Sequence, residues 1–163
     1  MATNLKNLSA LEGTEVSSAK NMKFGIVVSE WNSEITNSLL QGAINTLIKY
    51  KAKKSNIIVK HVPGSFELPL GAQFLIEYKE VDAVICLGCV IQGETKHFDF
   101  ICDAVSNGIT KVNLDYNLPV IFGLLTTNNQ QQAKDRSGGK HGNKGDEAAI
   151  TAIKMIAMKS SLQ

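Results

Sequence analysis

The chain has 163 residues, of which 44% are hydrophobic, and its formal net charge is +2. A chain of this length buries about two-thirds of its unfolded surface in one core. We therefore expect one domain over residues 21–163, preceded by a flexible N-terminal arm over residues 1–20. The nearly balanced charge, with no stripe of Lys and Arg interleaved with aromatic residues, argues against a nucleic acid as partner.

Membrane and disulfide-bonded classes are also disfavoured. The first twenty residues hold no apolar core typical of a signal peptide, and no apolar run approaches the ~20 residues that span a bilayer. We therefore expect a cytoplasmic protein without a membrane role. The odd number of cysteines, three, argues against a disulfide framework. Cys86 and Cys89 have C-x-x-C spacing, but on a strand they point to opposite faces, which favours two core residues.

Short β-rich runs alternate with helix-periodic segments along the chain. In chain order we predict a strand at 24–29, a helix capped by Asn32, a strand at 57–62, a helix with Pro69 in its first turn, a strand at 83–87, a helix from near Asp99, a strand at 119–125, a helix at 130–136 and a last helix capped by Asn143. This order predicts an α/β fold, a three-layer α-β-α sandwich with a four-stranded parallel sheet.

The stretch from Gly88 to Phe98 lies where the third strand hands over to a helix. Free backbone N–H groups at such a helix start, beside the hydroxyl of Thr95, form a site for an anion such as phosphate. His97 follows within a turn of that site.

In a parallel α/β sheet the ligand crevice lies outside the carboxyl ends of the strands. That rule collects Trp31 and Asn32, then residues 65–67, 93–98 and 122–127, into one predicted pocket. Taken singly, each side chain has an ordinary structural interpretation: Trp31 as core, Glu67 as a solvated acid at a helix start, His97 as a surface residue. Their joint position after successive strands favours a site.

These residues stand in a larger set of motifs. The set comprises residues 31–36 (WNSEIT), 62–69 (VPGSFELP), 88–98 (GCVIQGETKHF), 122–127 (FGLLTT), Gln132-Ala133 with Arg136, and 142–145 (GNKG). In order and spacing it resembles the lumazine synthase family from about Lys23 to Met158. The resemblance implies a flavodoxin-like fold and the penultimate step of riboflavin biosynthesis. In that step 5-amino-6-(D-ribitylamino)uracil condenses with 3,4-dihydroxy-2-butanone 4-phosphate to 6,7-dimethyl-8-ribityllumazine, with release of phosphate and water. It implies no cofactor and no metal.

The resemblance also implies roles for individual residues. His97 would shuttle protons and is the one expected catalytic residue. Phosphate binding would fall to Gly93, Glu94 and Thr95, with Arg136 supplied by an adjacent subunit. The pyrimidine and ribityl chain would contact Trp31, Asn32, Ser65, Phe66, Glu67, Val90, Ile91, Gln92, Phe122 and Lys144. Gln92 departs from the family, in which Arg or Lys is common at this position, and this puts an auxiliary phosphate contact there in doubt.

Sites shared between subunits imply a homo-oligomer, a pentamer by resemblance. The glycine-rich connection 138–144 matches the short turn of relatives that form icosahedral shells, so we expect sixty subunits and a possible association with riboflavin synthase. The alternative function is a non-catalytic module of the same fold that binds riboflavin or a lumazine. His97, Arg136 and the anion cradle favour the enzyme, because a flavin binder needs no phosphate clamp.

Overall fold

The computed structural model describes residues 7, 9, 10 and 16–162. Most of the arm expected over residues 1–20 therefore lies outside the described residues, although Ala19 is fully buried and its N–H donates to the carbonyl of Tyr50 at 2.8 Å. The elements, in chain order, are β1 (Phe24–Ser29), α1 (Ser33–Lys49), η1 (Lys54–Asn56), β2 (Ile57–Val62), η2 (Ser65–Glu67), α2 (Leu68–Tyr78), β3 (Ala83–Ile91), α3 (His97–Tyr116), β4 (Val120–Thr127), α4 (Gln130–Arg136), β5 (Ser137–Gly139), β6 (Gly142–Asn143) and α5 (Lys144–Ser161). No described helix is long and apolar enough to cross a membrane.

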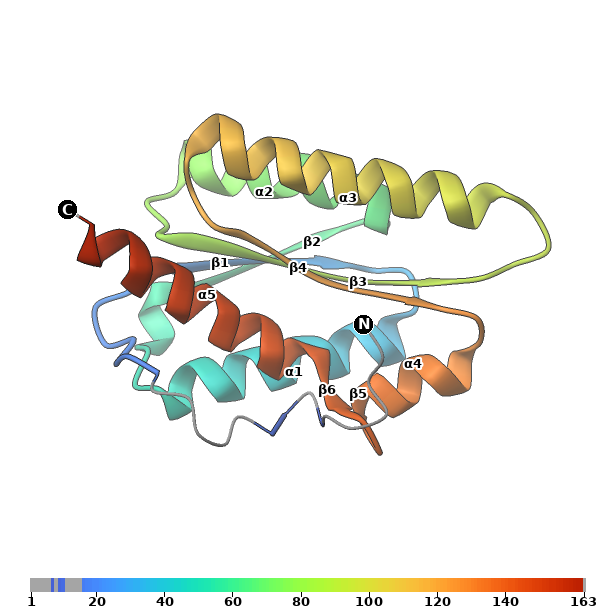
Figure 1. Cartoon of the computed structure of the whole chain (residues 1–163), viewed down its shortest axis with the longest axis horizontal. Coiled ribbons are helices and arrows are strands. Elements are labelled where there is room, and N and C mark those ends of the chain that lie inside the picture. The colour runs from blue at the N-terminus through green and yellow to red at the C-terminus, as the bar shows by residue number, and fades with distance from the viewer. Residues whose placement is uncertain (1–6, 8, 11–15, 163) are drawn as a thin grey trace.

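The main sheet has four parallel strands, as the alternation of strands and helices predicts, and their order is β2-β1-β3-β4. Figure 1 shows α2 and α3 on one face and α1, α4 and α5 on the other, which gives the three layers. All six residues of β1 are buried, because this central strand is covered on both faces. The predicted fold class is confirmed.

Two apolar cores lie on the two faces of the sheet. Phe24, Ile26 and Val28 of β1 face α1 and α5, whereas Val27 faces α2 and α3. Cys86 and Cys89 divide in the same way, and both thiols are buried. Burial raises the pKa of Cys86 to about 12 and that of Cys89 to about 11, so both are core thiols.

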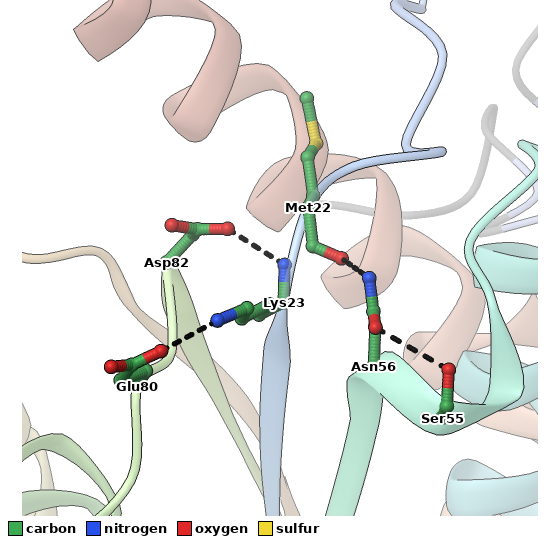
Figure 2. Close-up of polar contacts among 6 residues, drawn as sticks. All are labelled: Met22, Lys23, Ser55, Asn56, Glu80 and Asp82. Atoms are coloured by element: carbon green, nitrogen blue, oxygen red, sulfur yellow. Dashed lines mark hydrogen bonds and ion pairs between the residues drawn. The ribbon is translucent and has the colours of Figure 1, made fainter.

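The amino ends of the strands are tied together by polar contacts (Figure 2). The backbone N–H of Lys23 donates to Asp82 Oδ2 at 2.7 Å, and its Nζ pairs with Glu80 Oε2 at 2.7 Å. Asn56, just before β2, donates from Nδ2 to the carbonyl of Met22. Exposed ion pairs contribute little free energy, so these contacts mainly set the alignment of β1, β2 and β3.

Two strands run further than the sequence predicts. β3 continues through Gly88 to Ile91, and β4 continues to Thr127. Gly88 looks like a turn glycine in the sequence, yet a Cβ there would lie 2.4 Å from Leu124 Cδ1 and 2.8 Å from Ser65 Oγ. This glycine therefore permits close packing inside the sheet and does not end the strand.

Helix α5 begins at a tight contact with α1. Asn143 caps α5 as predicted, because its Oδ1 accepts from the N–H of Gly145 at 2.8 Å. A Cβ on Gly145 would lie 2.0 Å from the carbonyl oxygen of Leu39, so only glycine fits there. Before this cap, β5 and β6 form a small antiparallel hairpin that the sequence did not predict.

Candidate active site

The sheet reverses its winding direction between β1 and β3, where ligand crevices form in open α/β sheets. Figure 1 shows the end of β1, the β3–α3 connection, η2 and the start of α4 at the same edge of the molecule. The residues collected from the ends of β1, β2 and β3 therefore share this carboxyl edge.

Asn32 bridges the two strands at this point. The sequence predicts a side-chain cap for α1, but no such cap forms: Asn32 has left-handed backbone angles, φ 57° and ψ 46°. Its Nδ2 instead donates to the carbonyl of Cys89 at 2.9 Å. The pairing of β1 with β3 ends at Val28 and Leu87. Asn32 therefore supplies a donor to β3 where β1 has left the sheet.

The turns after β1 and β2 are joined by backbone bonds. The N–H of Glu30 donates to the carbonyl of Val62 at 2.9 Å, and that of Trp31 donates to the carbonyl of Pro63 at 3.3 Å. The Trp31 side chain is 73% exposed, which excludes the interpretation as a core residue. Its indole is thus an available flat surface beside Gly64, whose Cβ would lie 3.6 Å from Trp31 Cδ1.

The turn after β2 orients one carboxylate toward this surface. Glu67 Oε2 accepts from the N–H of Gly64 at 2.9 Å. This oxygen therefore acts as expected for an acid at a helix start. Oε1 accepts no hydrogen bond from the described residues. Ser65 is buried, whereas Phe66 is 58% exposed. Trp31, Gly64 and Glu67 therefore lie together, with Phe66 beside them in the chain.

The connection from β3 to α3 is an open loop. The N–H of Gln92 donates to the carbonyl of Thr127 at 2.8 Å, which holds the start of the loop on β4. Among the described residues, the N–H groups of residues 93–96 have no protein acceptor, and a Cβ on Gly93 would meet nothing within 4 Å. Thr95 Oγ1 accepts from the N–H of His97 at 3.4 Å. These donors stand at the start of a 20-residue helix, an arrangement that favours an anion, and His97 is exposed beside them.

Val90 and Ile91 end β3 on opposite faces. Val90 packs against the core under α2 and α3, and Ile91 against the core under α1 and α5. The two residues, both predicted to contact substrate, thus flank the loop from the two sides of the sheet. Gln92 follows them and is exposed.

Three predicted site residues lie elsewhere in this chain. The sequence groups Phe122 with the strand ends although it lies inside the predicted strand 119–125; in the structure it is the third residue of β4 and pairs with Cys86, five residues before the carboxyl end. Arg136 ends α4, and its Nη1 donates to the carbonyl of Gln132 at 3.1 Å. Lys144 begins α5 and pairs with Glu147 at 2.5 Å. Both helices lie on the face opposite α3 (Figure 1), so one chain does not bring Arg136 or Lys144 to His97.

The carboxyl edge is open to solvent. One groove, of about 630 Å³, lies between α1 and the β5–β6 hairpin, and another, of about 420 Å³, lies between the carboxyl ends of α3 and α5. Neither is lined by Trp31, Glu67 or residues 93–97. The described part of one chain thus leaves Trp31 and residues 93–97 open to solvent.

Two polar residues, Asn32 and Asp135, have structural roles that were not predicted from the sequence. The bridge from Asn32 to Cys89 depends on the place where β1 leaves the sheet, and no local pattern signals it. Asp135 lies in a polar helix typical of a solvated surface, yet the residue is only 9% exposed. The unpredicted hairpin lies close against it, since a Cβ on Gly139 would be 2.8 Å from Asp135 Cα.

The fold defines a flavodoxin-like α/β protein whose predicted site residues from the ends of β1, β2 and β3 lie at the switch point of its sheet. Residues 21–160 match the family model described as 6,7-dimethyl-8-ribityllumazine synthase, so the chain belongs to this family. Relatives of that name include one from Cytophaga hutchinsonii, 64% identical over 157 residues that cover 96% of this chain and 98% of the relative. Another, from Parabacteroides distasonis, is 59% identical over 156 residues and 96% and 98% of the two chains. One from Phocaeicola vulgatus is 56% identical over 163 residues and 100% and 97% of the two chains.

Proposed function

We propose that the carboxyl edge is the site of the reaction that membership of the family assigns to this chain. That reaction condenses 5-amino-6-(D-ribitylamino)uracil with 3,4-dihydroxy-2-butanone 4-phosphate to give 6,7-dimethyl-8-ribityllumazine. The observation that carries the assignment is the open loop 93–96, whose free N–H groups lie beside His97 at the switch point. The family and the relatives are named as synthases, which favours the enzyme over a non-catalytic flavin-binding module.

The two substrates occupy the two halves of the edge. The pyrimidine stacks on the exposed indole of Trp31, and the free Oε1 of Glu67 accepts from the ribityl hydroxyls or the ring edge. The phosphate sits on the N–H groups of Gly93, Glu94 and Thr95, where the positive end of the α3 dipole favours an anion. Holding both substrates in a fixed orientation supplies much of the acceleration, because proximity is worth up to roughly 7–11 kcal/mol.

His97 moves the protons. The amino group of the pyrimidine and the ketone form a Schiff base with loss of water, phosphate is eliminated, and ring closure releases a second water. Each step transfers a proton between nitrogen, carbon and oxygen. An exposed imidazole next to the phosphate cradle takes up and returns these protons, and it contributes at the low end for general acid–base catalysis.

A second copy of the chain completes the site. Three predicted site residues lie away from the carboxyl edge of their own chain: Phe122, Arg136 and Lys144. We therefore assign them to the carboxyl edge of a neighbouring chain. A head-to-tail contact of this kind gives a ring when the rotation between subunits closes. We take the ring to be a pentamer, as the family resemblance implies, and we place the enzyme in the cytoplasm.

Twelve such pentamers would form an icosahedral shell of sixty chains. The tight β5–β6 turn supports this proposal, because Gly138 and Gly142 adopt φ values of 115° and 80° that only glycine takes readily. The shell could hold riboflavin synthase, which consumes the product. Electron microscopy of freshly purified protein tests the assembly, and a uniform pentamer in several buffers would refute the shell.

The activity itself is tested by mixing the purified protein with both substrates and following the absorbance and fluorescence of the lumazine. We expect product to form only when both substrates and protein are present. Tight binding of riboflavin without product would establish the binding module instead.

A further inference from the structure

The β5–β6 hairpin separates the two cations that we assign to the neighbouring site. Arg136 is the residue immediately before the hairpin, and Lys144 is the residue immediately after it. The orientation of the hairpin therefore affects the direction in which both side chains leave the chain.

The base of the hairpin is fixed on α1. Ser38 Oγ donates to the carbonyl of Ser137, at the start of β5, and Asn143 Nδ2 donates to the carbonyl of Ser38 at 2.9 Å. The first residue of β5 and the last residue of β6 are thus both hydrogen-bonded to Ser38 of α1. Ser38 does not reach the turn at residues 140 and 141.

The turn is fixed on α4 by Asp135. Asp135 Oδ2 pairs with Lys140 Nζ at 3.1 Å, and Oδ1 accepts from Gln131 Nε2 at 2.9 Å. The carbonyl of Asp135 accepts from the N–H of His141 at 2.8 Å. A Cβ on Gly139 would lie 2.8 Å from Asp135 Cα, so the hairpin lies directly on the last turn of α4. The hydrogen bond from Gln131 and the contact with Lys140 keep the pKa of the Asp135 carboxyl below its usual value, so the group is ionised at neutral pH.

We propose that Asp135 is a positioning residue: it holds the hairpin against α4 and thereby sets where Arg136 and Lys144 present their cations to the neighbouring subunit. This inference rests on the proposed function, because the two cations matter only if Arg136 reaches the phosphate and Lys144 the pyrimidine or ribityl chain in a neighbour's site. Asp135 itself does not touch the substrate in this account.

The test compares Asp135→Asn with wild type in steady-state kinetics for each substrate. We expect the KM for the butanone phosphate to rise about ten-fold, since small displacements of binding groups are costly. The kcat should stay within about two-fold, and the KM for the pyrimidine should rise clearly less than that for the butanone phosphate, because Lys144, the cation assigned to the pyrimidine, is also held by Glu147. Asp135→Glu, which restores the charge, should recover most of the loss. Asp115→Asn is the matched control, because it removes an exposed pair with Lys111 on α3, far from the hairpin.

Hydrogen exchange gives a readout besides activity. Residues 137–143 should exchange faster in Asp135→Asn and not in Asp115→Asn. An unchanged KM for the phosphate substrate would overturn the inference. An equal rise in the KM values of the two substrates would overturn it as well. If Asp135→Asn does not assemble, Lys140→Gln, which removes the partner of Oδ2, must show the same selective rise in KM. Wild type without synthase activity would instead refute the proposed function.

Discussion

The bridge from Asn32 to Cys89 allows a quantitative test of how the switch point is held. Asn32→Gly removes the amide that donates to the Cys89 carbonyl at 2.9 Å but suits the left-handed backbone, φ 57°. Asn32→Ala removes the same bond and also places an ordinary side chain in that conformation. The two variants therefore separate the hydrogen bond from the backbone strain.

The magnitudes follow from the surroundings. Cys89 is 2% exposed, so water reaches its carbonyl poorly, and a buried acceptor without a partner costs about 1–3 kcal/mol. We expect Asn32→Gly to lower the free energy of unfolding by about 1–2 kcal/mol, at the low end because the edge is close to solvent. Asn32→Ala should lose about 1 kcal/mol more, since a residue with a Cβ is strained in the left-handed region.

Urea unfolding followed by circular dichroism measures both differences, at one fixed subunit concentration because an oligomer unfolds in a concentration-dependent way. Asn32→Gly as stable as wild type would show that the bridge contributes nothing to folding. An equal fall in the free energy of unfolding in the two variants would show that the left-handed backbone at residue 32 adds no strain. Either result would refute the reasoning.

Three further predictions concern the site and the thiols. Arg136→Ala should raise the KM for the butanone phosphate and leave the KM for the pyrimidine nearly unchanged, which substrate titrations measure; an unchanged phosphate KM would contradict the role. His97→Ala should lower kcat by about 10²-fold or less, and complete loss in an assembled variant would show a larger role. At pH 8 only about 10⁻⁴ of Cys86 is thiolate, with a pKa of about 12. An aromatic disulfide reagent should therefore label at most Cys102 in native protein and all three thiols in urea, and fast native labelling of Cys86 or Cys89 would contradict their burial.

The fold was predictable because each local signal agrees with the global arrangement. Strand β1 and helix α4 lie at the residues that the sequence indicates, Pro69 lies in the first turn of α2, and Asn143 caps α5, as expected. The sequence-based predictions are wrong where a residue packs against segments that are distant in the sequence. Gly88 resembles a turn residue, but its neighbours Leu124 and Ser65 come from distant segments, so no local pattern reveals its role.

The grouping of several predicted site residues at one edge has a geometric reason. Parallel strands carry the residues that follow them to the same edge, which unites Trp31, Glu67 and residues 93–97 in one chain. Phe122 does not obey this rule, because it lies within β4, about 16 Å before the carboxyl end at 3.3 Å per residue. Arg136 follows β4 but belongs to a helix on the opposite face from α3.

The position of these two residues bears directly on assembly. No rearrangement of side chains within one chain can carry Phe122 along its strand or move α4 through the sheet, because the strand is paired along its length and both cores are packed. If both residues serve this reaction, the site must lie between two chains. The activity should then depend on subunit concentration below the dissociation point of the ring, and a fully active isolated monomer would refute the shared site.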